Sequence, residues 1–232
     1  MTKVIRNYLG ALAVLPFLLA PTISGAFELT GFAVGVGFTG AAVEIVGTEK
    51  NPEGTSVSGK SLEEMQYPFV FGEARFNIRD RFGVTLGLDF IPGEADFVAE
   101  SKADSDLDGT AGTTTTGTST VNGTMKNHTT LYIQPTLSLT DVFSVYLSAG
   151  YVAVQVEADA KLVTSTNFVK RQVTNGTRLG AGVMAQGANG FFVKLEANAT
   201  DYDDVSFTTS ESTTVSANTD TEGASLLIGK AF

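Results

Sequence analysis

One segment of the sequence has the residue types and the spacing of a cation site. Asp104, Asp106 and Asp108 occupy alternate positions and Gly109 follows them, as at the start of a calcium-binding loop. Thr115 stands where the full motif needs a bidentate Glu, so the motif is incomplete. We interpret the segment as an acidic, solvated loop and keep a weak calcium site as the alternative. No other cofactor is expected.

His128 is the single histidine of the chain and could serve as a general base beside a serine and an acid. Ser and Asp occur throughout the sequence, so no partner can be chosen for it. The chain has no Cys, which excludes disulfides, thiolate metal sites and cysteine catalysis. We interpret His128 as an ordinary surface residue near a loop and predict that the chain is not an enzyme.

Six charged residues stand among small side chains and could pair with one another. Three are acidic and three are basic, so their charges sum to zero: Glu73, Asp89, Glu196, Arg75, Arg178 and Lys194. An enclosed interior tolerates paired charges and makes unpaired ones costly. We therefore predict an interior charge network of these six residues.

Composition narrows the class of protein. The chain has 232 residues, a formal charge of −10 and 17% charged residues, so no nucleic-acid partner is expected, because such proteins carry a basic patch. Residues 1–26 run from Lys3 and Arg6 through an apolar stretch to Ser24-Gly25-Ala26. This order predicts a signal peptide that is cleaved near Ala26, with a single membrane-spanning helix as the weaker alternative.

Eight segments of residues 27–232 alternate apolar and small or polar residues with period two, which is typical of β-strands. They are 31–43, 67–78, 82–90, 128–139, 143–151, 177–186, 191–198 and 223–232. Pro135 interrupts one of them, and we predict a local bulge at 134–136.

Short and long connections alternate along the chain. Three are tight turns, at 79–81, 140–141 and 188–190, and four are long and polar, at about 47–66, 92–127, 157–176 and 201–221. This alternation predicts an all-β, eight-stranded antiparallel up-and-down transmembrane β-barrel with four long extracellular loops. Five phenylalanines border the short turns and would form one aromatic girdle: Phe76, Phe82, Phe143, Phe191 and Phe232.

Alternation alone would also fit a soluble lipocalin-like barrel, whose apolar face points inward. The second face of the segments is rich in Gly, Ser, Thr and Ala and carries few charges, unlike a surface in water. Small side chains fit the narrow interior of an eight-stranded barrel. We therefore predict that the apolar face contacts lipid, which places residues such as Leu86, Leu137 and Val193 outside.

The C-terminal segment Ser225–Phe232, with Leu226, Ile228 and the final Phe232 on its apolar face, resembles the last strand of bacterial outer-membrane barrels. Gly72–Phe82 is similar to a hairpin of small OmpA-like and OmpX-like barrels, here without a periplasmic domain. The resemblance implies a Gram-negative outer membrane, with its lipid and lipopolysaccharide as surroundings. It also implies that Phe232, Ile228 and Leu226 are a signal to the barrel assembly machinery.

The function expected from this reading is a structural and surface-interaction role through acidic extracellular loops, with an unknown extracellular partner. A narrow channel for ions or small solutes is the alternative. A lipid-modifying outer-membrane enzyme that uses His128 and a soluble lipocalin-like binder are the least favoured.

Overall fold

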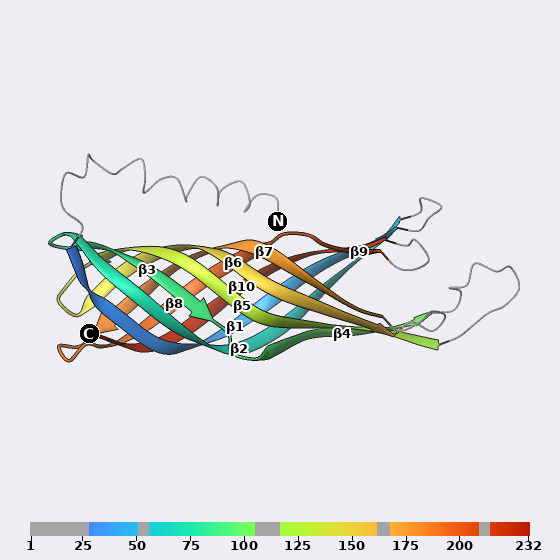
Figure 1. Cartoon of the computed structure of the whole chain (residues 1–232), viewed down its shortest axis with the longest axis horizontal. Coiled ribbons are helices and arrows are strands. Elements are labelled where there is room, and N and C mark those ends of the chain that lie inside the picture. Colours follow the sequence, from blue (N-terminus) through green and yellow to red (C-terminus); the bar gives the residue numbers. More distant parts are fainter. Residues whose placement is uncertain (1–27, 51–55, 105–116, 162–167, 209–213) are drawn as a thin grey trace, which may run out of the picture.

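Strands make up nearly all of the protein that the structure describes. The computed structural model describes residues 28–50, 56–104, 117–161, 168–208 and 214–232, which form one elongated barrel (Figure 1). Among these residues, no helix is long and apolar enough to cross a bilayer. The strands are β1 (Glu28–Lys50), β2 (Ser56–Arg79), β3 (Phe82–Phe90), β4 (Glu94–Asp104), β5 (Gly117–Ser138), β6 (Phe143–Lys161), β7 (Phe168–Gln186), β8 (Phe191–Tyr202), β9 (Val205–Thr208) and β10 (Thr214–Ala231).

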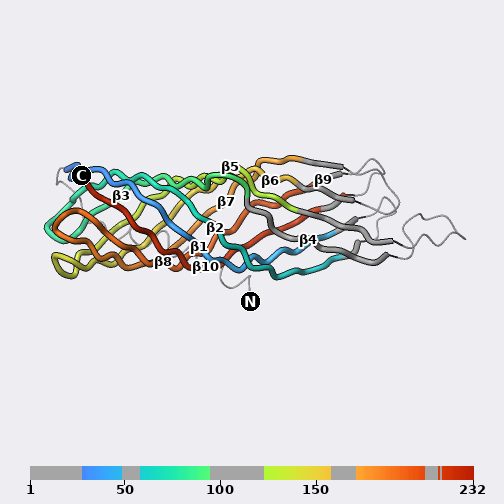
Figure 2. The backbone as a smooth tube through the Cα atoms, turned by 90° about the horizontal axis from the view of Figure 1, so that it is seen from below, coloured from blue at the N-terminus to red at the C-terminus, as the bar shows by residue number. Residues whose placement is uncertain are grey.

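The strands follow one another around a closed ring. Neighbours are antiparallel, and β1 pairs with β10 to close the wall. β3 and β4 lie end to end along β5, and β8 and β9 lie end to end along β10, so the strands fill eight places. The predicted eight-stranded antiparallel barrel is confirmed. Figure 2 shows the strands winding obliquely around the long axis, with the short turns at the end that holds the C-terminus.

The apolar faces of the strands point outward, as predicted. Leu86, Leu137 and Val193 are 48%, 46% and 42% exposed, whereas Glu73 and Lys194 are 4% and 1% exposed. An apolar exterior around a charged interior is the arrangement of a barrel in lipid and the reverse of a barrel in water. The lipocalin-like alternative is therefore excluded.

The strands are longer than the sequence suggested. β1 runs to Lys50 and β2 begins at Ser56, so most of the range 47–66 is strand rather than loop. The ranges 92–127, 157–176 and 201–221 are likewise mostly strand wherever they are described. Their polar composition looked like that of loops, but Thr and Val are strand formers, and the inward side chains still pack. The strands thus continue well past the predicted segments at this long-strand end.

Two prolines split the wall at the long-strand end. In the register that leads from Val70 and Phe90, Pro68 of β2 would pair with Pro92. The Ile91 N–H donates to the His128 backbone carbonyl on β5 (3.0 Å), so the nitrogen of Pro92 faces β2. A proline nitrogen carries no hydrogen and cannot donate to β2. Beyond this point β2 pairs only with β1, and β4 only with β5, among the described residues. An unpaired seam results between β2 and β4.

A second seam lies between β7 and β9. The last backbone hydrogen bond there is donated by the Asp203 N–H to the Asn175 carbonyl of β7 (2.7 Å). Beyond it, β9 pairs with β10. The long-strand end therefore consists of two four-stranded sheets, β9-β10-β1-β2 and β4-β5-β6-β7. Apolar side chains from both sheets pack in one cluster between them: Val43 and Met65 from the first, Met125, Val152 and Val154 from the second, and Tyr202 of β8.

The predicted bulge at 134–136 is wrong. Pro135 pairs with Val84 of β3 in regular register, and the β5–β6 register is the same on both sides of it. The proline removes ladder pairs with β6 and inserts no residue. The bulge of β5 lies instead between Lys126 and Thr129, where Asn127 has a φ of 53°. Asn tolerates this left-handed conformation better than most residues.

Candidate functional site

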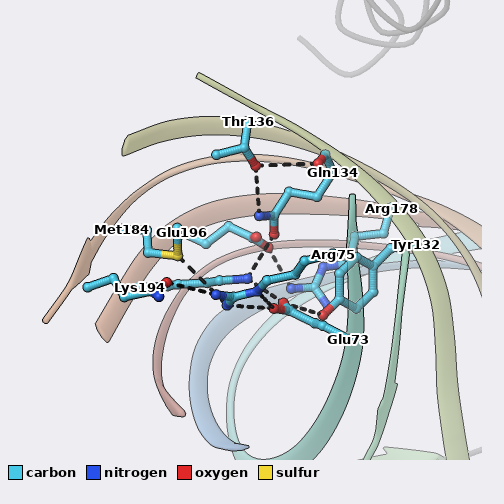
Figure 3. A network of polar contacts seen from close by, with 10 residues as sticks. Glu73, Arg75, Tyr132, Gln134, Thr136, Arg178, Met184, Lys194 and Glu196 are labelled. Atoms are coloured by element: carbon cyan, nitrogen blue, oxygen red, sulfur yellow. Dashed lines mark hydrogen bonds and ion pairs between the residues drawn. The ribbon is translucent and has the colours of Figure 1, made fainter. Parts of the chain in front are cut away.

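Glu73 of β2 is the centre of one buried ion cluster (Figure 3). Its carboxylate accepts hydrogen bonds from Lys194 Nζ of β8, from Arg75 Nη2 (2.9 Å) and Nε (3.2 Å), and from the Tyr132 hydroxyl of β5 (2.9 Å). Lys194 Nζ also donates to Gln134 Oε1 (3.0 Å). Period-two alternation aims all of these side chains inward from β2, β5 and β8. The cluster holds one anion and two cations, a net charge of +1.

Arg178 of β7 is the centre of a second cluster. It donates from Nη1 to Asp89 Oδ2 of β3 (2.9 Å) and from Nη2 to Glu196 Oε1 of β8 (2.7 Å). This cluster carries a net charge of −1 and balances the first. The structure thus places all six charged residues named from the sequence inside the barrel, in two groups. Such pairs are tolerable in a low-dielectric interior only when fully hydrogen-bonded, as most of these are.

Aromatic rings fill the lumen around the Glu73 cluster. The rings of Phe71 and Phe192 lie 6.1 Å apart between centroids. Arg75 Cζ stands 4.3 Å from the centre of the Phe192 ring, and Lys194 Nζ stands 5.5 Å from it. Both cations therefore gain cation–π attraction in addition to their ion pairs. The rings also lower the local dielectric constant, which strengthens the electrostatic contacts beside them.

His128 belongs to the lumen and not to the surface, so its predicted location is wrong. The residue is 5% exposed, and its Nε2 lies 3.0 Å from the Tyr202 hydroxyl. The bulge at Asn127 explains this, since an extra residue reverses the alternation and turns both Met125 and His128 inward. The hydrogen bond of the ring goes to a phenol rather than to an acid, so the contact that would orient a catalytic base is not made by this nitrogen.

The same bulge turns Lys126 outward into a ladder of charges. Lys126 Nζ lies 2.8 Å from Glu94 Oε1 and 3.3 Å from Glu157 Oε2, and Arg171 Nε lies 2.6 Å from the same Glu157 oxygen. The hydrogen bond from Arg171, with help from Lys126, holds the pKa of Glu157 below its usual value. The hydrogen bond to Glu94 raises the pKa of Lys126. The ladder joins β4, β5, β6 and β7 on the outer wall.

A polar vestibule opens at the short-turn end of the lumen. Its volume is about 270 Å³, and its walls include Arg75, Arg81, Gln134, Thr136 and Gln186. Arg75 forms the inner boundary, because it donates to Gln186 Oε1 (2.8 Å) and to Glu73. The vestibule therefore ends at the Glu73 cluster.

The C-terminal strand presents its apolar side chains outward. Leu226, Ile228 and Phe232 are exposed, as are Phe82, Phe143 and Phe191 near the short turns. Lys230 is a charged residue on this face, and its Nζ lies 4.9 Å and 5.5 Å from the ring centres of Phe191 and Phe232. The charge thus stands at the edge of the apolar belt, where a cation costs little.

The candidate calcium ligands are not tested by the structure. Asp106 and Asp108 lie outside the described residues, as do the side chain of Asp104 and the predicted signal peptide. Among the described residues, no three His, Cys, Asp or Glu side chains gather closely enough to hold a metal ion.

The sequence analysis did not identify the uncharged residues that hydrogen-bond to the buried charges, nor the aromatic rings that fill the lumen beside them. Tyr132 and Gln134 complete the hydrogen bonds of Glu73 and Lys194. Phe71 and Phe192 share the inward parity of Glu73 and Lys194, two residues away in each strand. Extending the period-two assignment to every residue of the polar face would have found all four.

Comparison with known proteins agrees with this architecture. The model of the family described as outer membrane protein beta-barrel domain matches residues 10–219, while no curated protein matches the sequence. The outer membrane protease OmpT from Escherichia coli is similar in structure at 8% identity and a TM-score of 0.54, covering 91% of this chain and 100% of its own. The outer membrane protein OprG from Pseudomonas aeruginosa is similar at 13% identity and a TM-score of 0.52, covering 88% and 97%. At such identities the likeness concerns the fold alone. Because the family model matches most of this chain, the chain belongs to the outer membrane protein β-barrel domain family, whose members reside in the bacterial outer membrane.

Proposed function

We propose that the protein is a non-conducting outer-membrane barrel with a structural and surface-interaction role, in which the two sheets of the long-strand end stand outside the cell. The observation that carries the proposal is that the lumen is filled at two successive levels. The ion clusters and phenylalanines form one level, and the apolar cluster around Val152 and Met125 forms the next.

An ion that crossed the lumen would have to break buried pairs. Removing one partner of a buried ion pair costs about 3–5 kcal/mol, which corresponds to roughly 10²–10⁴-fold in population. The lumen would then have to open again through apolar side chains that are almost fully buried, Val152 and Val154 among them. Two barriers of different chemistry in series favour a closed barrel over the channel.

The proposed surface role depends on the connections at the long-strand end, beyond the apolar outer surface of the barrel. We propose that the acidic connections at the long-strand end meet partners and lipopolysaccharide cations outside the cell, and that the chain is not an enzyme. We also propose cleavage of the leader near Ala26 and assembly of the barrel through the signal of Phe232, Ile228 and Leu226. Proteolysis of whole cells tests the orientation. Cuts should fall in the connections at the long-strand end, at 51–55, 105–116, 162–167 and 209–213, and a cut at 79–81 would mean that the barrel has the opposite orientation.

Planar-bilayer recording tests the closed lumen. The wild-type barrel should give no steady openings. A variant that clears both levels, with Glu73→Ala, Arg75→Ala and Lys194→Ala in the ion cluster and Met125→Ala and Val152→Ala in the apolar cluster, is the matched sample in which conductance should rise. Steady wild-type openings as large as those of the variant would refute the proposal and favour the narrow channel.

The seam between β2 and β4 supports a second candidate, the passage of small apolar molecules. Porin-type interiors are polar, yet this lumen is apolar at the level where the wall lacks ladder pairing. Cysteines at Gln66 and Glu94, which the register would bring opposite one another, could be joined to close the seam. Uptake of a small apolar dye into vesicles should fall when the bridge forms, and unchanged uptake would exclude this candidate.

A further inference from the structure

A small cavity lies where the two ion clusters of the lumen meet. Its volume is about 20 Å³, and Asp89, Arg178, Glu196, Tyr132, Gln134 and Ser148 contribute polar walls. A cavity can hold one water when it offers roughly 10–15 Å³ and two to four polar partners. The space therefore suits one water molecule and nothing much larger.

The hydroxyl of Ser148 points to an occupant. Ser148 is 8% exposed, and its Oγ has no hydrogen-bond partner among the described residues. A Cβ added at Gly180 would lie 2.4 Å from Ser148 Oγ and 2.9 Å from Glu196 Oε1. Ser148 Oγ and Glu196 Oε1 both lie close to this Cβ position and are therefore close enough to each other for a single water to hydrogen-bond to both.

The charges beside the cavity favour a neutral dipole over an ion. Arg178 with Asp89 and Glu196 has a net charge of −1, whereas Glu73 with Arg75 and Lys194 has +1. Partners of both clusters line the cavity: Glu196 and Asp89 from the first, Tyr132 and Gln134 from the second. A water between them can donate to the acidic side, whereas an added ion would unbalance two clusters whose charges sum to zero.

We infer that one water molecule is a fixed part of the lumen, where it accepts a hydrogen bond from the Ser148 hydroxyl and donates one to the Glu196 carboxylate. It joins the two ion clusters into one continuous polar layer. It also completes the hydrogen bonding of the buried hydroxyl, as buried water does elsewhere in proteins. This inference is independent of the proposed non-conducting function, because a barrel that lacked this water could still be closed to ions.

A high-resolution crystal structure of the detergent-folded protein tests the inference. The wild type should show a density peak within hydrogen-bond distance of Ser148 Oγ and Glu196 Oε1. Gly180→Ala places a methyl group in close contact with both oxygens and should abolish the peak. Ser144→Ala is the matched control, since Ser144 is also buried on β6 but already contacts Ser138 Oγ (3.4 Å), and the peak should persist.

Three results would overturn the inference: no wild-type peak, a peak that survives Gly180→Ala, or a peak with the coordination of a metal ion. Ser148→Ala removes the anchor without adding atoms and should lower the peak, so the test stands if Gly180→Ala does not fold. Single-channel recording on the same wild-type sample distinguishes this failure from that of the proposed function. A closed barrel without the peak refutes only the water.

Discussion

Replacing Lys194 by Met tests whether the Glu73 cluster stabilises the barrel. The change keeps the volume and removes the charge, and it leaves Glu73 with only Arg75 and Tyr132 as partners. Breaking a buried pair costs about 3–5 kcal/mol, and the two remaining partners place the expected loss near 3 kcal/mol. Both residues are almost fully buried, so solvent screening does not reduce this figure.

Urea titration in lipid vesicles measures the loss, followed by the fraction that migrates as folded on an unheated gel. The chain has no Trp, so gel migration replaces the usual fluorescence signal. Adding Glu73→Gln leaves Arg75 without its carboxylate and should lower the stability further, but by less than Glu73→Gln costs in the wild type, because the Glu73–Lys194 pair is already absent. The expected coupling energy is about 1–3 kcal/mol. Lys230→Met is the matched control on the outer face and should change stability by about 0.5 kcal/mol or less. A loss below 1 kcal/mol for Lys194→Met, or no coupling with Glu73→Gln, would refute the reasoning.

Four further predictions follow from other parts of the barrel. Boiling should shift the migration of the folded protein on a detergent gel, and a protein that is soluble without detergent and does not shift would contradict the membrane assignment. Asn127→Gly should fold like the wild type, whereas deleting Asn127 should drive Lys126 into the apolar lumen and abolish the folded band. The lowered pKa of Glu157 means that the outer ladder stabilises the fold above the usual Glu pKa and that this contribution disappears as the pH falls through the lowered value. Amide exchange of β6 and β7 should therefore accelerate in acid, and Arg171→Gln should weaken the effect. Deleting Phe232 should lower the assembled fraction in cells more than folding into micelles, and equal losses in both would count against an assembly signal.

The barrel class could be predicted because lipid and a narrow interior impose period-two alternation on the sequence. Leu86 and Val193 on one face and Glu73 and Lys194 on the other are sufficient to orient the wall. The strand lengths could not be predicted in the same way. Past Val43 and before Tyr67 most residues are polar, and only the packing of inward side chains such as Met65 against the opposite sheet distinguishes a strand extension from a loop.

The bulge shows where local reasoning fails. Pro135 was the visible irregularity, yet the strand passes through it in register because the loss of a donor does not require an additional residue. The register shift lies at Asn127, where the adjacent residues include no proline or glycine that would indicate it. A shift of one residue is set by which neighbours fit on each side, so the inward positions of His128 and Met125 were decided by tertiary packing.

The sequence by itself determined that eight alternating segments bury a balanced set of charges and present an apolar surface to lipid, because that pattern follows from the solvent on each face. Only the tertiary structure decided which charges meet, since Glu73 and Lys194 lie 121 positions apart and come together through the tilt of the wall. The division of the long-strand end into two sheets also depends on the tertiary structure. Pro68 and Pro92 break a ladder only because the register sets them opposite one another.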